Sequence, residues 1–255
     1  MSLAWRTSYG RAVTAWHALL WGAFAASSLL VGQALSGPLS GSPRATGLLM
    51  GFGAGTLISA VGFELVPEAS FEDVGIGVAF ALGAGALLYY GADRLVDGMG
   101  GADRQKLADP DAAGSPWAMF IGALLDGVPE SFVLGSTLAV GGAIDAAFLA
   151  AVFVSNVPEG VAGTASLRAT GATDRRIFAN WAVLVAMSSL FAALGFLLAD
   201  VTPKQGIYVE AFAGGAVLTV LADSMMPEAF RHGGRAVGLL TVLGYIVAGT
   251  LSVAQ

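Results

Sequence analysis

Acidic residues inside long apolar runs constrain this chain more than any other feature of its sequence. A helix that crosses a membrane needs about 20 mostly apolar residues, and eight such segments occur within the 255 residues. Only 12% of the residues are charged, about half the share that is usual for a soluble domain. The sequence therefore predicts an all-α fold, a polytopic membrane bundle of eight transmembrane helices that forms a single transmembrane domain over residues 1–255. The spans are expected near 13–36, 45–69, 74–92, 116–139, 143–167, 178–200, 207–230 and 235–254.

Lysine and arginine are divided unequally between the two sides of such a bundle. With alternating spans, nine fall on one side and three, Arg6, Arg11 and Lys204, on the other. Because cytoplasmic loops carry the excess of positive charge, we expect a multi-pass protein of the cell membrane with both termini outside and the polar connector 93–115 in the cytoplasm. The net charge of −6 does not suggest a nucleic-acid partner. Five acids flank the outer side, either as solvated helix ends or as a surface that concentrates cations: Glu72, Asp73, Asp145, Asp200 and Glu210.

One short motif, a proline followed directly by a glutamate, recurs in four of the predicted spans. Its copies are ELVPEA (64–69), DGVPES (126–131), SNVPEG (155–160) and SMMPEA (224–229). The first and last belong to longer similar segments, 53–69 and 213–229, which align without gaps and share Gly55 and Gly215. In the predicted topology these segments cross the membrane in opposite directions, as do the two middle copies. Inverted repeats with interrupted helices and a site near the midplane are typical of secondary transporters.

The two middle copies place polar side chains near the centre of the membrane. Asp126 lies four residues before Glu130, and Ser155 lies four residues before Glu159, so that each pair shares one helix face; Asn156 lies beside the second pair. The proline of each motif cannot donate to the carbonyl group four residues earlier. Each helix is therefore expected to be broken there and to offer a free carbonyl oxygen to a cavity.

Three carboxylates at this depth require compensation, because even one charge at the bilayer centre costs about 2.5–3.5 kcal/mol on insertion scales. No lysine or arginine lies within the four acid-bearing spans. A divalent cation would compensate the cluster; protons, or hydrogen bonds to uncharged acids, are the alternatives. The oxygen ligands favour manganese, magnesium, calcium or ferrous iron, whereas zinc sites usually include histidine or cysteine.

Four further acids are candidates for a transport pathway. Glu64 and Glu68 lie one turn apart at the outer end of the second predicted span, and Asp223 and Glu228 lie in the inner half of the seventh. They are expected to form entrance and exit carboxylates. For Glu68 and Glu228 a simple interfacial role is an equal alternative.

This pattern resembles the ZIP family (zinc/iron-regulated transporter-like) of metal-ion transporters, in a prokaryotic form. The resemblance covers eight spans, both ends outside, a long inner third connector, and the motifs of the fourth and fifth spans. The family usually reads H-N-x-P-E-G in the fourth and H-E-x-P-H-E in the fifth, whereas this chain has DGVPES and SNVPEG. The family histidines are replaced here by Asp126, Ser155 and Glu159, and the asparagine of the fourth by Gly127.

The resemblance implies a transported divalent metal ion, zinc, manganese or iron, and no separate cofactor. It assigns the main metal site to Asp126, Glu130, Ser155 and Glu159, with Asn156 as the remaining polar residue of a second site, so that we expect one bound ion. It also implies an elevator-like movement of one helix group against another and a homodimer in the lipid membrane. The function predicted is alternating-access metal transport and no enzymatic activity; the alternatives are a metal-dependent intramembrane enzyme and a non-transporting metal sensor.

Overall fold

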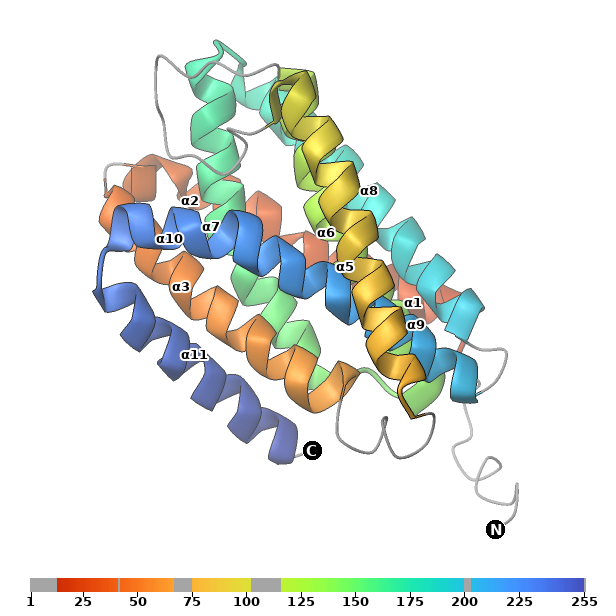
Figure 1. Cartoon of the computed structure of the whole chain (residues 1–255). Helices are drawn as coiled ribbons and strands as arrows, with labels where there is room; N and C mark the ends of the chain where they lie inside the picture. Colours follow the sequence, from red (N-terminus) through yellow and green to blue (C-terminus); the bar gives the residue numbers. More distant parts are fainter. Residues whose placement is uncertain (1–12, 41, 67–74, 102–115, 200–202, 255) are drawn as a thin grey trace.

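The computed structural model describes residues 13–40, 42–66, 75–101, 116–199 and 203–254. These ranges are almost entirely helical and contain no strand. The helices are α1 (Ala15–Ala26), α2 (Ser28–Ser40), α3 (Pro43–Ala60), α5 (Gly77–Val96), α6 (Pro116–Gly141), α7 (Ala146–Ala169), α8 (Asp174–Ala199), α9 (Pro203–Val220), α10 (Met226–Gly233) and α11 (Ala236–Val253). Figure 1 shows that they form a bundle of long helices. The polytopic all-α fold is therefore confirmed.

Seven helical segments in the described part of the chain are long and apolar enough to cross a membrane. They are Ala15–Leu39, Pro43–Leu65, Trp117–Gly141, Ala146–Ala169, Asp174–Ala199, Gly206–Gly233 and Ala236–Val253. Many large apolar side chains point outward from the bundle; Phe80 and Leu239, for example, are 73% and 74% exposed. An outer surface of this kind requires a hydrocarbon environment, and the chain is a multi-pass membrane protein.

The third predicted span corresponds to α5, which is not among these seven segments. It has 20 residues, which is long enough, but its C-terminal part carries Tyr89, Tyr90, Asp93 and Arg94, which lower its mean hydropathy. The helix also continues beyond the predicted end at residue 92, and a π-helical turn, Asp97–Gly101, follows it. The expected connector at 93–115 is thus helical up to residue 101, and its remainder lies outside the described residues.

The first predicted span is interrupted at Ser27, between the end of α1 and the start of α2. The hydroxyl groups of Ser27 and Ser28 donate hydrogen bonds to the carbonyl oxygens of Phe24 and Ala25. Serine side chains that bond to the preceding turn in this way often bend helices. The two pieces together remain one apolar segment.

The two long repeated segments share an irregularity at equivalent positions. In each, the α-helix changes to a π-helical turn, Val61–Leu65 after α3 and Leu221–Met225 after α9. Figure 1 shows α3 and α9 running in opposite directions. Helix breaks were expected at Pro129 and Pro158 in the other two motif-bearing helices, which are continuous α-helices in the described structure.

Glycine contacts of α3 and α9 are equivalent as well. A Cβ atom added to Gly55 would lie 1.9 Å from the carbonyl oxygen of Thr241 in α11, and one added to Gly215 would lie 1.9 Å from that of Leu82 in α5. Such distances leave no room for a side chain. Helix α3 therefore packs on α11 in the way that α9 packs on α5, which supports an inverted repeat.

The most extensive helix packings are those of α3 on α11, α6 on α8, α5 on α9 and α2 on α7. We call α1, α2, α6, α7 and α8 the first helix group, and α3, α5, α9, α10 and α11 the second helix group. The groups meet mainly where α3 packs on α7 and where α6 packs on α9. A buried apolar cluster fills this boundary with residues such as Leu57, Leu134 and Val217.

Candidate metal site

Helices α6 and α7 carry the predicted site and are continuous through their prolines. Pro129 lies inside the 26-residue α6 and Pro158 inside the 24-residue α7. The expectation that these prolines break the helices is therefore wrong. A proline still lacks the N–H group that would bond to the carbonyl oxygen four residues earlier, but neighbouring turns keep the helix intact.

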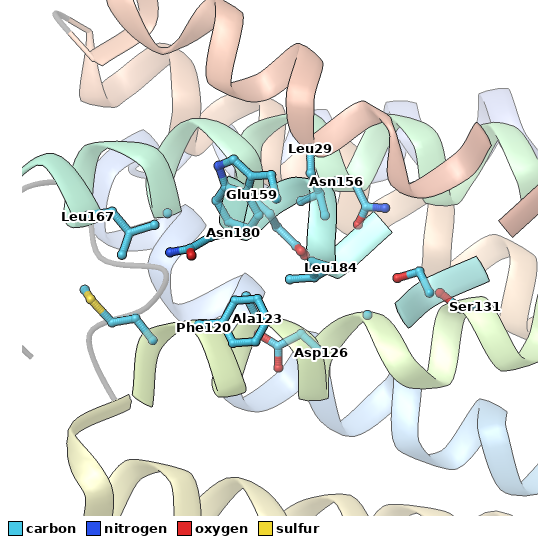
Figure 2. Close-up of a pocket in the computed structure, with 15 residues that line it drawn as sticks. Leu29, Phe120, Ala123, Asp126, Ser131, Asn156, Glu159, Leu167, Asn180 and Leu184 are labelled. Carbon is cyan, nitrogen blue, oxygen red and sulfur yellow. The ribbon is translucent and has the colours of Figure 1, made fainter. Parts of the chain in front are cut away.

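A narrow cavity lies between α6, α7 and α8, with part of α2 at its wall. Figure 2 shows Asp126 reaching it from α6 and Asn156 and Glu159 reaching it from α7. Its volume is about 30 Å³, which suits one water molecule or one small ion. Three more polar side chains line it, namely Ser131, Asn180 and Ser188.

Glu130 is the most deeply isolated acid of the site. Its side chain is 3% exposed, and its Oε2 atom is buried with no hydrogen-bond partner among the described residues. Asp126 and Glu159 both lie close enough to repel it. Since α6 contains no lysine or arginine and α7 contains only Arg168, in its last turn, neither helix supplies a neutralising cation at this depth.

Asp126 accepts a hydrogen bond from the phenol of Tyr89, on α5. Its side chain is 2% exposed, and that of Tyr89 is 3% exposed. A buried carboxylate without such a donor would lose most of its solvation, so this bond stabilises the observed position of Asp126. Tyr89 was not predictable as part of the site, because a single tyrosine in an apolar helix carries no signal of this contact.

Ser155 does not reach the cavity. It packs against α3, where a Cβ atom added to Gly53 would lie 2.8 Å from its Cα atom. Its hydroxyl group donates to the carbonyl oxygen of Val152 at 3.0 Å. The α7 residues that line the cavity are instead Asn156, Glu159, Gly163 and Leu167, a stripe that is displaced from Ser155 by one position around the helix.

The acids of the site do not form a closed coordination shell. In the described part of the chain, no three aspartate, glutamate or histidine side chains are placed so as to hold one metal ion. Asp126 and Glu159 line the cavity, whereas Glu130 does not. The structure therefore brings the predicted acids into one neighbourhood and leaves Asp126 engaged with Tyr89.

The predicted pathway acids lie in different surroundings. Glu64 is partly buried in the first π-helical turn and interacts with Asp145 and Ser252. Glu210, 7% exposed on α9, lies near both Glu64 and Asp145. Asp223 is exposed in the other π-helical turn. These acids therefore do not continue directly into the cavity of α6 and α7.

The other two predicted pathway acids are Glu68 and Glu228. Glu68 lies outside the described residues. Glu228 is buried and bonds to Nε2 of His232 at 2.7 Å and to Arg231 at 3.3 Å. Both partners belong to the same helix as Glu228, α10.

Asn180 extends the site toward one end of the bundle. It lines the narrow cavity and also a second pocket of about 280 Å³, formed by the end of α7, the turn at 170–173 and the start of α8. Leu167 is shared by the two cavities as well. The sequence analysis missed Asn180, although Asn180, Leu184 and Ser188 follow one another at four-residue intervals and share one helix face.

Comparison with known proteins agrees with a membrane protein related to metal transport. No protein-family model matches the chain. A protein of Arabidopsis thaliana with the name "putative zinc transporter" is 26% identical to it over 197 residues. The alignment covers 74% of this chain and 31% of the relative, so the chain spans about a third of the length of that curated protein.

Proposed function

We propose that this protein transports divalent metal ions across the membrane, with Asp126, Glu130, Asn156 and Glu159 forming the binding site. The observation that carries this proposal is Glu130, whose Oε2 atom is buried and without a partner beside two further acids. A buried carboxylate of this kind needs a counter-charge. A cation in the adjoining cavity supplies one, and it can leave again because the site is otherwise incomplete.

The chemistry of the donors defines the class of ion. Carboxylate and amide oxygens suit hard divalent cations such as manganese and ferrous iron. The name of the Arabidopsis relative adds zinc to the candidates. Ser155 faces α3 and is therefore not among the proposed ligands. Asn156 lines the cavity and is included.

We infer that transport proceeds by alternating access, with the two helix groups moving relative to each other. The polar cavity lies within the first helix group. Most of the close glycine contacts lie within one group; a Cβ atom added to Gly135 of α6, for example, would lie 1.7 Å from the carbonyl oxygen of Ala192 in α8, whereas the contact of Gly53 with Ser155 crosses the boundary. The boundary between the groups is mostly apolar, so that sliding along it breaks few hydrogen bonds. This arrangement supports an elevator-like movement of the kind that the ZIP resemblance implies.

The polar connection through Asn180 supports a release route toward the end of the bundle where α7 meets α8. That end holds Arg168, Arg175 and Arg176 and is the cytoplasmic side in the predicted orientation. The conformation described here would thus face the cytoplasm. The substrate would enter from the opposite side, near the acids Glu64, Asp145 and Glu210.

Purified protein in liposomes loaded with a metal-sensitive dye tests this function. Manganese, ferrous iron and zinc are each added outside, with and without a pH gradient, and influx is recorded. We expect saturable influx of at least one ion, and a loss of at least tenfold in Glu130→Gln and Glu159→Gln. Asp174→Asn, which changes a carboxylate with a 72% exposed side chain, is the control and should transport normally.

Two results would contradict the proposal. Normal influx in both glutamine variants would remove the assigned site. Specific binding without influx by the wild-type protein would favour the metal sensor, and turnover of a lipid or peptide without influx would favour the intramembrane enzyme.

A further inference from the structure

The ring of Tyr89 is anchored in the second helix group. It is buried and packs with Ala216 and Val220 of α9, its partner helix in that group, and with Leu125 of α6. Helices α5 and α9 are held together closely, since a Cβ atom added to Gly85 would lie 1.8 Å from the carbonyl oxygen of Phe212. Tyr89 therefore has little freedom to follow α6 if the two helix groups separate.

The hydroxyl group of Tyr89 crosses to the first helix group. It donates a hydrogen bond to Oδ1 of Asp126 on α6. Asp126 lines the narrow cavity, and Asn156 and Glu159 line the same cavity from α7. This single bond thus joins an acid of the proposed site to the opposite helix group.

We propose that Tyr89 is a positioning residue that binds Oδ1 of Asp126 when the site is empty, and that a bound cation competes with Tyr89 for this carboxylate. This inference rests on the transport function proposed above. A carboxylate oxygen that accepts a hydrogen bond from the phenol is a weaker ligand for a cation. If the carboxylate of Asp126 rotates toward Glu159, it must also give up its hydrogen bond to Tyr89. The bond between the helix groups is then lost as the ion is bound.

In this arrangement, binding of the cation is coupled to loss of a hydrogen bond between the two helix groups. The empty site keeps the hydrogen bond between α5 and α6, and the occupied site gives it up, while the apolar contacts between these helices remain. The first helix group, which contains the cavity, would consequently move more readily when loaded than when empty. Tyr89 itself would contact no ion, and its effect would act through Asp126.

The substitution Tyr89→Phe tests this role, because it removes the hydroxyl group and retains the ring. Hydrogen bonds to charged groups contribute about 1.5–3 kcal/mol, so Mn²⁺ should bind roughly ten- to a hundredfold more tightly to Tyr89→Phe than to the wild type. By linkage, the metal-free variant should unfold at a lower temperature than the metal-free wild type, whereas both proteins saturated with Mn²⁺ should unfold at the same temperature. Isothermal titration and thermal unfolding in detergent measure the two effects.

Tyr90→Phe is the matched control. Tyr90 is the next residue of α5, is 44% exposed, and accepts a hydrogen bond from Arg94 at 2.7 Å. Its substitution should leave the affinity for Mn²⁺ unchanged. A purely structural role for Tyr89 would instead lower the unfolding temperature equally in the metal-free and metal-saturated states, and that result overturns the proposal.

A measurement on the wild type covers the case in which Tyr89→Phe does not fold. In protein with isotopically labelled tyrosine, Mn²⁺ should shift the infrared C–O band of one buried tyrosine, and an unchanged band overturns the proposal. Normal Mn²⁺ binding by the wild type with unchanged affinity in Tyr89→Phe overturns the role of Tyr89 alone. Absence of any binding of manganese, iron or zinc to the wild type overturns the transport function as well.

Discussion

At the scale of single residues, the burial of Glu130 has a cost that a bound cation would offset. Its unpaired Oε2 atom and its two acidic neighbours destabilise the metal-free protein. Substitution of Glu130 should therefore increase the stability of the metal-free protein and at the same time weaken metal binding.

We expect Glu130→Gln to raise the free energy of unfolding of the metal-free protein by about 1–3 kcal/mol, because the amide is always neutral, whereas Glu130 must either take up a proton or carry a charge that Asp126 and Glu159 repel. The added stability conferred by Mn²⁺ should disappear in the same variant. Thermal unfolding with and without Mn²⁺ measures both. A metal-free variant that is less stable than the wild type would show that Glu130 has a stabilising partner.

Asn180 provides a second test at this scale. Asn180→Leu should block the polar connection between the narrow cavity and the open pocket and slow metal influx by about tenfold, the effect of roughly 1.4 kcal/mol on a barrier. Equilibrium binding should not change, because the acids remain. Asn180→Ser retains a polar side chain and should transport faster than Asn180→Leu; equal rates would exclude Asn180 from the route.

The site was only partly predictable, for reasons that these residues illustrate. Asp126 and Glu159 line one cavity, and both were expected near the centre of adjacent predicted spans. Four-residue spacing relates only residues of the same helix, such as Ser155 and Glu159. It could not tell which neighbouring stripe of α7 faces the cavity, so that Ser155 was included although it packs against α3. Tyr89 reaches Asp126 only through tertiary packing, which local spacing does not encode.

At the scale of helices, glycine pairs determine how closely neighbours pack. On the α6–α8 contact, Gly135 faces the backbone of Ala192, and Gly195 faces that of Phe132 at 2.0 Å from an added Cβ atom. Any methyl group here must push the two helices apart.

Gly135→Ala should therefore lower the free energy of unfolding by about 1–3 kcal/mol, the usual range for overpacking. Gly83→Ala is the control, since nothing lies within 4 Å of its added Cβ atom. There the substitution should be neutral or should stabilise α5, because alanine favours helices over glycine by about 0.5–1 kcal/mol. Equal destabilisation by both changes would contradict the close α6–α8 contact.

The irregular helices show what the sequence could not predict at this scale. Prolines pointed to breaks in α6 and α7, yet both helices continue through them. The π-helical turns arise instead just before the motif prolines of the second and seventh predicted spans. A π-helical turn differs from an α-helix by one inserted residue, and its local sequence has no distinct pattern.

At the scale of the whole molecule, the predicted orientation can be tested directly because the chain contains no cysteine. Thr173→Cys places one thiol in the exposed turn between α7 and α8, and Ala143→Cys places one in the exposed turn between α6 and α7. In intact cells, an impermeant maleimide should label Ala143→Cys and leave Thr173→Cys unlabelled until the cells are opened. The reverse pattern would invert the assignment of the cytoplasmic side and of the release route.

The class of fold was the most predictable property at this scale, because long apolar segments have few alternatives to membrane helices. The membrane assignment of α5 could not be fixed in the same way. Its apolar part is followed by Asp93 and Arg94, and composition alone does not distinguish a spanning helix from one that lies against its neighbours. Labelling from both sides of the connector after α5 would resolve this point.

The equivalent glycine contacts of α3 and α9 also bear on the history of the chain. Gly55 and Gly215 press against different helices, yet each allows the same approach to within 1.9 Å of an added Cβ atom. A substitution that destabilises one repeated segment should therefore also be destabilising at the equivalent position of the other segment, which crosses the membrane in the opposite direction. A complete mutational scan should consequently give two matching profiles of tolerance along 53–65 and 213–225, the imprint of an ancestral duplication that each half still preserves independently.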